Sequence, residues 1–170
     1  MWQDSLNEQN IHLIDGATNP GGPLKEGAIL SPVTATDKWD LIRSLHKALC
    51  IRENLDAALA AEIEKELIDR EKLMSTGIGE QMAIPHAVIP GACRFMTECA
   101  IIKDGLDFDS IDGSKAYVVV MLVAPKSALQ EHLKMMASIA QVFYKAETRQ
   151  KVIAASTAAE ALAIIRAARP

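Results

Sequence analysis

The chemistry that this sequence could perform centres on one histidine in a glycine- and proline-rich stretch, STGIGEQMAIPHAVIPG (residues 75–91). His86 directly follows Ala-Ile-Pro, and few charged residues lie near it in the chain. Proline fixes the backbone φ angle, and glycine lets the backbone come close to another group. A neutral imidazole is a competent nucleophile near pH 7, and exposed backbone N–H groups in such a stretch can bind an anion. His86 is therefore a candidate to attack a phosphoryl group.

Familiar motifs built on glycine or histidine do not fit this stretch. Met82 stands where a G-x-G-x-x-G dinucleotide fingerprint needs its third glycine, and no G-K-[ST] follows to make a phosphate-binding P-loop. The chain has no G-x-S-x-G nucleophile elbow and no H-E-x-x-H zinc motif. His46 and Cys50 have an i, i+4 spacing, but two ligands do not make a zinc site, so we interpret them as helix-face residues. We predict neither a metal nor a cofactor.

Attack on a phosphoryl group needs positive charge or N–H donors around the phosphoryl oxygens, and two residues could help. Arg70 lies sixteen residues before His86 and could supply the cation. His132 follows an apolar strand by a short turn, where a site at the end of a sheet would form. On spacing alone, all three residues also have ordinary explanations. His86 could be a satisfied loop histidine, Arg70 a solvated arginine at a helix end, and His132 a histidine at a helix border.

Two helices are expected before this stretch. Residues 37–50 have Asp37 as a plausible N-cap, and residues 54–72 have Asn54 in that position. Their apolar faces are Trp39, Ile42, Leu45 and Leu49 in the first, and Leu55, Leu59, Ile63 and Leu67 in the second.

Further helices are expected near the C-terminus. Residues 127–143 open with a possible capping box of Ser127 and Gln130, a short helix follows near Glu147, and Thr157 with Glu160 could cap the last helix. The helix at 127–143 has an apolar stripe that should face the core, with His132 at its border: Leu129, Leu133, Met136, Ala140 and Phe143.

Two apolar runs, residues 93–105 and 115–125, predict strands, and shorter strands are expected around Ile29 and Met82. The second run is continuously apolar, which is typical of a strand covered on both faces. Helices and strands in this order predict a single α/β domain with a small, covered sheet. Residues 1–25 are polar and end in Gly and Pro, so we expect a partly mobile N-terminal extension before a domain at 26–170.

The composition excludes several classes of protein. A net charge of −4 and a pI near 5.6 argue against nucleic acid as the main partner. No apolar run reaches about eighteen residues, so we predict no stable membrane insertion, and the N-terminus lacks the features of a signal peptide. Three cysteines without a CxxC pattern fit reduced thiols, and the protein is expected in the cytoplasm: Cys50, Cys93 and Cys99.

A longer segment containing His86 has a family resemblance. REKLMSTGIGEQMAIPHAVIPG (residues 70–91) resembles the active-site signature of the fructose/mannitol-type (type 2) IIA domains of the bacterial phosphoenolpyruvate-dependent phosphotransferase system, which include the nitrogen-regulatory IIA proteins. The resemblance continues through residues 104–143, with an Asp-Gly turn, an apolar strand ending in Ala-Pro, and a histidine followed by Leu. It covers residues 29–166 and departs at Gln81, where the family often has a small residue, and in the N-terminal extension.

The resemblance implies a fold and a set of roles. The fold would be a small mixed β-sheet flanked by helices on both faces. His86 would accept a phosphoryl group from the phosphohistidine of an HPr-type carrier, His132 would support the phosphorylated ring, and Arg70 and Thr76 would belong to the same site. Neither departure touches the histidines. We expect partners to dock on an apolar surface around His86, formed by Met82, Ile84, Val88 and Ile89.

Three functions remain open. The protein could carry phosphate to a IIB domain in sugar uptake, or its phosphorylation could switch binding to regulatory targets. No IIB or membrane segment is recognisable in the chain, which favours the regulator. The third function is a binding module that kept the fold but is never phosphorylated, and the presence of both histidines argues against it.

Overall fold

The computed structural model describes residue 24 and residues 26–168. The proposed N-terminal extension, residues 1–25, therefore lies outside the described residues except for Leu24, which is buried. A short 3-10 helix, η1 (Glu26–Ala28), leads into β1 (Ile29–Leu30), and two long helices follow, α3 (Lys38–Glu53) and α4 (Ala57–Leu73). The strands predicted at 93–105 and 115–125 are β5 (Met96–Leu106) and β6 (Ala116–Pro125). Three C-terminal helices complete the fold: α5 (Leu129–Val142), α6 (Ala146–Ala154) and α7 (Ala158–Ala167).

The glycine- and proline-rich stretch forms strands rather than one loop. It contains β2 (Gly77–Gly79), β3 (Met82–Ala83) and β4 (His86–Ile89). All of the strands join one mixed six-stranded sheet in the order β1-β5-β6-β3-β2, in which β4 also pairs with β6. β5 runs antiparallel to β6, whereas β3 and β4 pair in parallel with successive parts of β6.

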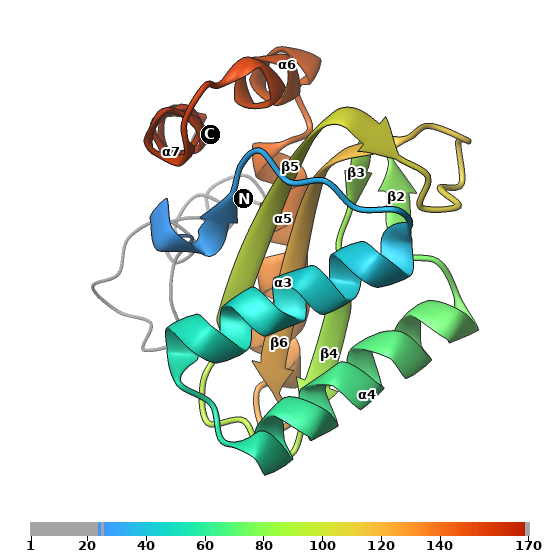
Figure 1. Ribbon diagram of the computed structural model, residues 1–170, viewed down its shortest axis with the longest axis vertical. Coiled ribbons are helices and arrows are strands. Elements are labelled where there is room, and N and C mark those ends of the chain that lie inside the picture. The colour runs from blue at the N-terminus through green and yellow to red at the C-terminus, as the bar shows by residue number, and fades with distance from the viewer. Residues whose placement is uncertain (1–23, 25, 169–170) are drawn as a thin grey trace, which may run out of the picture.

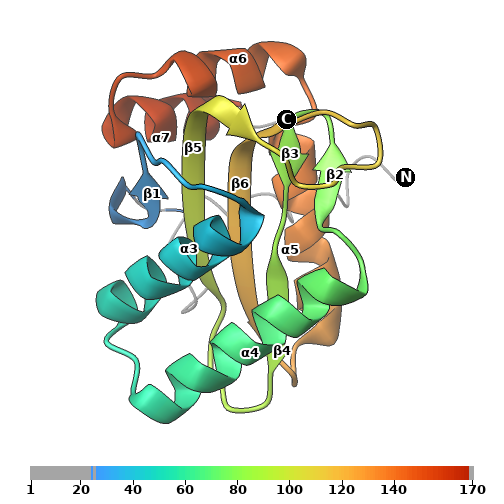
Figure 2. The same cartoon turned by 45° about the vertical axis from the view of Figure 1, so that its right-hand side comes forward.

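Helices cover both faces of this sheet, as the resemblance implied (Figure 1). α3 and α4 lie across one face, and α5 runs along the other, which the turned view shows clearly (Figure 2). Two apolar clusters fill the layers. One joins Leu122 of β6 to Met135 and Ile139 of α5, and the other joins Val123 of β6 to Leu41 of α3. β6 contributes to both clusters because its neighbouring side chains point to opposite faces.

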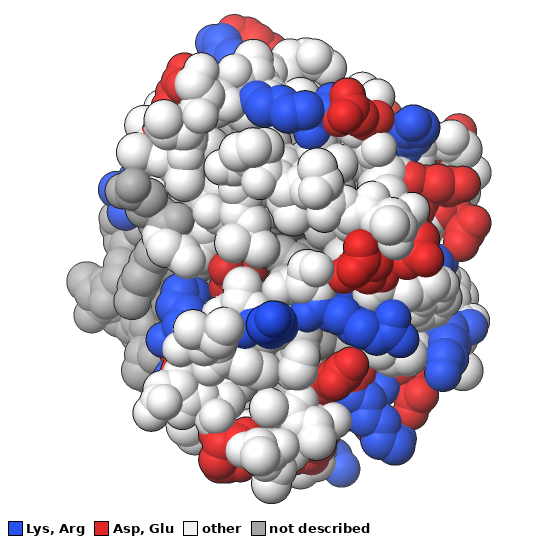
Figure 3. Space-filling model, in the orientation of Figure 1, with Lys and Arg blue, Asp and Glu red and all other residues white. Residues whose placement is uncertain are grey.

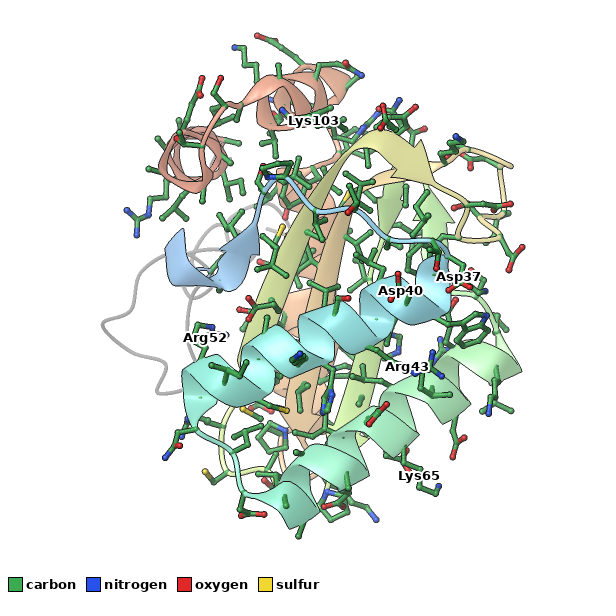
Figure 4. All side chains as sticks on the ribbon, viewed as in Figure 1. Asp37, Asp40, Arg43, Arg52, Lys65 and Lys103 are labelled. Atoms are coloured by element: carbon green, nitrogen blue, oxygen red, sulfur yellow. The ribbon has the colours of Figure 1, made fainter. Side chains whose placement is uncertain are left out.

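Of the two N-caps predicted for the first two long helices, one is correct and one is wrong. Asp37 caps α3, because its carboxylate accepts a hydrogen bond from the N–H of Asp40, and both residues lie at the first turn in Figure 4. Asn54 does not cap α4. It ends α3 in the left-handed conformation, with φ at 51°, and Asp56 caps α4 through the N–H of Leu59. Asparagine suits both helix ends, because it caps N-termini and tolerates the left-handed region.

The prediction for α5 is wrong in its cap and in part of its buried face: Phe143 is buried and Met136 and Ala140 are half-buried against the core, but the other two predicted residues are exposed. The helix begins at Leu129 after Ala128, with no side-chain cap, so Ser127 and Gln130 form no capping box. Leu129 and Leu133 are 57% and 62% exposed, while the buried side is displaced by about one residue. That side consists of His132, Met135, Ser138, Ile139 and Val142.

The last helix confirms its predicted start. Thr157 accepts a hydrogen bond from the N–H of Glu160, and the Glu160 carboxylate accepts one from the N–H of Ser156. α6 lies where a short helix was expected near Glu147. None of the helices in the described part of the chain has the length and apolar character that a membrane crossing requires. Acidic and basic side chains are mixed over the α3–α4 face in Figure 3.

Candidate functional site

His86 is the first residue of β4 and lies directly after a proline. It pairs with Leu122 of β6, whose side chain packs in the cluster on the α5 face. Paired residues of parallel strands point to the same face, so His86 points towards α5. β4 pairs only with β6 among the described strands, which leaves its other edge open to a side chain from α4.

Two hydrogen bonds fix the His86 ring. Its Nδ1 lies 2.8 Å from the carbonyl oxygen of Ile84, and the Nε of Arg70 donates to its Nε2 at 3.1 Å. A carbonyl only accepts and a guanidinium only donates, so these partners assign the proton to Nδ1 and the lone pair to Nε2. Nε2 is therefore the nucleophilic atom of the site.

Arg70 reaches this atom from the last turn of α4. The guanidinium is also held by a backbone carbonyl, because Nη1 of Arg70 donates to the carbonyl oxygen of Met74 at 2.8 Å. The guanidinium charge therefore lies beside Nε2, where a phosphoryl group bound to His86 would be. Arginine suits this position because its planar donors can contact several oxygens of one phosphoryl group.

His132 faces His86 from the first turn of α5. The two ring centroids lie 5.4 Å apart and the ring planes are inclined by 47°. His132 is 4% exposed, and its buried Nδ1 has no hydrogen-bond partner among the residues that the structure describes. A buried unpaired polar atom costs free energy, so it marks a position where a ligand could supply the missing partner.

Burial keeps both rings neutral near pH 7. It lowers the pKa of His86, which the adjacent Arg70 charge lowers further, although the Ile84 carbonyl and Glu71 act in the opposite direction. Burial also lowers the pKa of His132, with a smaller contribution from His86. The unprotonated form required of a nucleophile is thus favoured at His86.

Thr76, the fourth residue that the resemblance implied, does not contact the imidazole through its hydroxyl. Its N–H and Oγ1 both donate to Oε2 of Glu71, at 3.0 and 2.5 Å. Its carbonyl accepts the N–H of Ile84 at 3.0 Å, next to the Ile84 carbonyl that fixes His86. The structure thus brings His86, His132 and Arg70 together and leaves Thr76 one layer behind them.

The sequence reasoning missed the buried pair behind Thr76. Glu71 is 2% exposed and its Oε1 lies 3.1 Å from Nζ of Lys38, which is 8% exposed and also contacts Asp109 at 2.7 Å. The spacing of residues along α4 could have indicated Glu71. Glu71 continues the buried positions Ile63 and Leu67 at intervals of four residues, so a charge was to be expected on the inner face of α4.

The turn between β2 and β3 is constrained from several sides. Gly79 has a φ of +83°, and an added Cβ would lie 2.9 Å from the Asp112 carboxylate. Glu80 and Gln81 also have positive φ, at 53° and 66°. Asp112 accepts from the N–H of Glu80, and Arg149 forms an ion pair with the Glu80 side chain. Gln81, where the sequence departs from the family pattern, thus lies in a turn away from the two histidines.

The apolar surface predicted around His86 is wrong in its residues. Met82, Ile84 and Ile89 are buried in the core, and Val88 is half-buried. Other large apolar side chains are exposed on the elements that carry the site, and we call them the exposed apolar set: Met74, Ile78, Leu129 and Leu133. The reason is the pairing of β3 and β4 with β6, which directs the apolar residues of the stretch into the two clusters.

No group of three or more His, Cys, Asp or Glu residues in the described part of the chain could hold a metal ion. The geometry of the site is instead that of a nucleophilic imidazole with an adjacent guanidinium and a second buried imidazole.

Comparison with known proteins identifies relatives of the chain. A nitrogen regulatory protein of Pseudomonas aeruginosa is 34% identical over 99 residues, which are 58% of this chain and 64% of that protein, less than two thirds of its length. The nitrogen regulatory protein IIA-Ntr of Neisseria meningitidis superposes with a TM-score of 0.74 at 28% identity, over 83% of this chain and 94% of that one.

A third similar protein shares the fold. It is Escherichia coli enzyme IIAMtl in a complex with phosphorylated enzyme IIBMtl, with a TM-score of 0.71 at 20% identity over 85% of this chain and 97% of that one. The family described as "Phosphoenolpyruvate-dependent sugar phosphotransferase system, EIIA 2" matches residues 23–168, nearly the whole chain. The chain therefore belongs to this EIIA type 2 family.

Proposed function

We propose that the protein is a phosphocarrier in which Nε2 of His86 accepts a phosphoryl group from the phosphohistidine of an HPr-type protein. The observation that carries this proposal is the pair of bonds on the His86 ring. The Ile84 carbonyl holds the proton on Nδ1, and the Nε2 lone pair lies beside Arg70. The proposed functional unit comprises residues 26–170, the domain expected from the sequence.

In the proposed step, the Nε2–P bond forms while the N–P bond of the donor histidine breaks. The donor imidazole leaves with the electron pair of its N–P bond. The donor ring carries a proton on its other nitrogen, so it leaves as a neutral imidazole. In the step itself the His86 proton stays on Nδ1, hydrogen-bonded to the Ile84 carbonyl, so the new ring forms protonated, with its charge beside the phosphoryl oxygens, and no external base is needed. A phosphohistidine is exchanged for a phosphohistidine, and the protein contributes positioning and charge rather than a new reactant.

Arg70 and His132 act on the transferred group. Arg70 already donates to the atom that attacks, so the guanidinium must turn from Nε2 to the phosphoryl oxygens as the new bond forms. In that position it neutralises charge on a group in transfer. The unpaired Nδ1 of His132 is available for a hydrogen bond in the phosphorylated state.

Partners would dock over the exposed apolar set. Leu129 and Leu133 flank His132 on α5, and Met74 supplies the carbonyl that anchors Arg70. Exposed leucines beside a reactive group are typical of an interaction surface. The proposed donor is an HPr-type carrier, and the proposed acceptor is a IIB domain, as in the E. coli mannitol complex. A phosphoenolpyruvate-driven chain of this kind would operate in the cytoplasm.

A regulatory use of the same phosphorylation is the second candidate. It is favoured by the similarity to two proteins named as nitrogen regulatory, at 34% and 28% identity. In that case phosphorylation of His86 would change the affinity for a target protein, and no sugar would be moved. The remaining alternative is a module that binds partners but is never phosphorylated. The following experiment distinguishes it from the two candidates above.

The direct test is reconstitution of the transfer. The protein is incubated with labelled phosphoenolpyruvate, enzyme I and HPr, and samples are kept at alkaline pH because N–P bonds are acid-labile. We expect one acid-labile phosphoryl group per chain, and none in His86→Ala, which should fold normally because the side chain is only half-buried. Absence of label, while a control IIA protein is labelled in the same mixture, would make the protein a binding module.

A further inference from the structure

We propose that Glu71, held by Lys38, is a positioning residue that sets the tautomer of His86 from a distance. The inference rests on the proposed function for its consequence in phosphoryl transfer. Its structural part concerns the unphosphorylated protein alone. Glu71 forms no hydrogen bond with the imidazole, so apart from the through-space effect of its charge it acts on the ring through the residues between them.

The carboxylate of Glu71 uses both of its oxygens. Oε1 lies 3.1 Å from Nζ of Lys38, and Oε2 accepts the N–H and the hydroxyl of Thr76. The Glu71 side chain is fully buried and that of Lys38 is 10% exposed. Burying a carboxylate costs free energy unless it is paired and hydrogen-bonded, so Lys38 and Thr76 together hold the Glu71 carboxylate in one position.

From Thr76 the contacts continue through the backbone to the ring. The Thr76 carbonyl accepts the N–H of Ile84 at 3.0 Å, and the Ile84 carbonyl accepts Nδ1–H of His86 at 2.8 Å. This hydrogen bond therefore links the residue just before β2, Thr76, to the residue just after β3, Ile84. A displacement of Thr76 would move the Ile84 carbonyl that holds the Nδ1 proton.

The last turn of α4 therefore acts on both nitrogens of one ring. Arg70 contacts Nε2 directly, and the next residue, Glu71, supports the partner of Nδ1 indirectly. α3 begins near the point where α4 ends (Figure 1), which is why Lys38, the first residue of α3, can reach Glu71. Only the Nδ1–H tautomer leaves a lone pair on Nε2, so the buried pair selects the nitrogen that reacts.

The test compares Glu71→Gln with Asp69→Asn. The amide in E71Q would turn an N–H donor towards either Lys38 or Thr76, both of which donate, and so break one side of the network. D69N is the matched control, because Asp69 lies on the same helix in an exposed pair with Lys65 at 2.7 Å. Lys65 extends from α4 at the margin of the molecule in Figure 4.

The primary readout is the tautomer of His86, from the ¹⁵N shifts of its ring above pH 7. The wild type and D69N should show one tautomer with the proton on Nδ1, and E71Q should show a mixture. Labelling by phospho-HPr should slow on the order of 10- to 100-fold in E71Q, the usual effect of a misplaced reacting group. Part of the phosphoryl group should then appear on Nδ1.

Retention of the single Nδ1–H tautomer in folded E71Q would overturn the inference, whatever the transfer rate. Failure of the wild type to accept phosphate would overturn the proposed function and leave the tautomer comparison valid. Thermal unfolding checks that E71Q is folded. If it is not, Thr76→Val decides, since it removes only the hydroxyl bond to Glu71. A partial tautomer shift would support the inference, and a wild-type spectrum would overturn it.

Discussion

The end of α4 and the beginning of α5 face the same imidazole, but they are built differently. On the α4 side, Arg70 has two hydrogen-bond acceptors and Glu71 has three donors. On the α5 side, the helix has no side-chain cap, His132 has a buried unpaired Nδ1, and Leu133 is exposed. One side of the ring is thus held before any ligand arrives, and the other offers groups that lack partners.

This difference suggests a division of work. The α4 side orients the nucleophile, because its contacts are complete in the unphosphorylated protein. The contacts of the α5 side form only when a phosphoryl group or a partner surface is present. That contact removes the free-energy cost of the unpaired His132 nitrogen and of the exposed Leu133 side chain. Changes on the α4 side should therefore alter the rate of transfer, whereas changes at exposed residues on the α5 side should alter binding.

The largest effect should come from Arg70→Ala. The variant loses the charge beside Nε2, and removal of one such stabilising group costs on the order of 100- to 1000-fold in rate. The measurement is the single-turnover rate of labelling by phospho-HPr. Arg70→Lys should recover only part of the loss, because an ammonium cannot bond Nε2 and the Met74 carbonyl with the same planar geometry. Full activity of R70K would show that charge alone suffices.

A smaller loss is expected for His132→Ala. One hydrogen bond to the charged phosphoryl group would be lost, which corresponds to about 1.5–3 kcal/mol, or roughly 10- to 150-fold. The lifetime of the phosphorylated protein should change as well as the labelling rate, and both are measured by quenching at alkaline pH. An unchanged rate and lifetime would make His132 an ordinary buried residue and remove the main asymmetry between the two sides.

Leu133→Asp should affect binding and leave the chemical step unchanged. The side chain is 62% exposed, so the fold should tolerate the change, while a docking partner would meet a charge in place of an apolar contact. We expect KM for phospho-HPr to rise several-fold, on the order of 1 kcal/mol, with little change in kcat. Ile51→Asp is a matched control, since Ile51 is 72% exposed and lies on α3. Equal effects of the two substitutions would argue against a localised docking surface.

The smallest effect is a pH dependence of stability. The pKa of His86 is lowered in the folded protein, mainly by burial, so the unfolded chain binds more protons as pH falls below the ordinary value of about 6.5. His86 therefore costs no stability above that pH, and the wild type loses stability as pH falls through the lowered folded pKa. Urea unfolding between pH 7 and 5 should show a weaker loss for His86→Gln. Parallel curves would mean that the His86 pKa is unshifted.

Much of the fold and the core of the site followed from the sequence. The apolar runs predicted β5 and β6, and Asp37 and Thr157 correctly marked two helix starts. His86, Arg70 and His132 do lie together. Their proximity was not derivable from spacing, because α4, β4 and α5 meet only through the pairing of β4 with β6 and the return of α5 across the sheet.

The errors have a common physical cause. On α5, the buried side includes His132 and Ser138, so the first part of the predicted apolar stripe, Leu129 and Leu133, is an exposed surface, whereas its last residue, Phe143, is in the core. On α4, the inner face carries Glu71, which apolar periodicity leaves out. Polar residues were buried where the site needs them, and apolar residues were exposed where we propose that partners dock.

The most direct test of the account is to identify the nitrogen that carries the phosphoryl group. The protein, uniformly enriched in ¹⁵N, is phosphorylated with phosphoenolpyruvate, enzyme I and HPr and examined by ³¹P and ¹H–¹⁵N NMR at alkaline pH. We expect one phosphohistidine, with phosphorus coupled to Nε2 of His86 and no coupling to Nδ1. Phosphorus on Nδ1 of His86, or on His132, would contradict it, because the bonds from Ile84 and Arg70 would then not select the reacting atom.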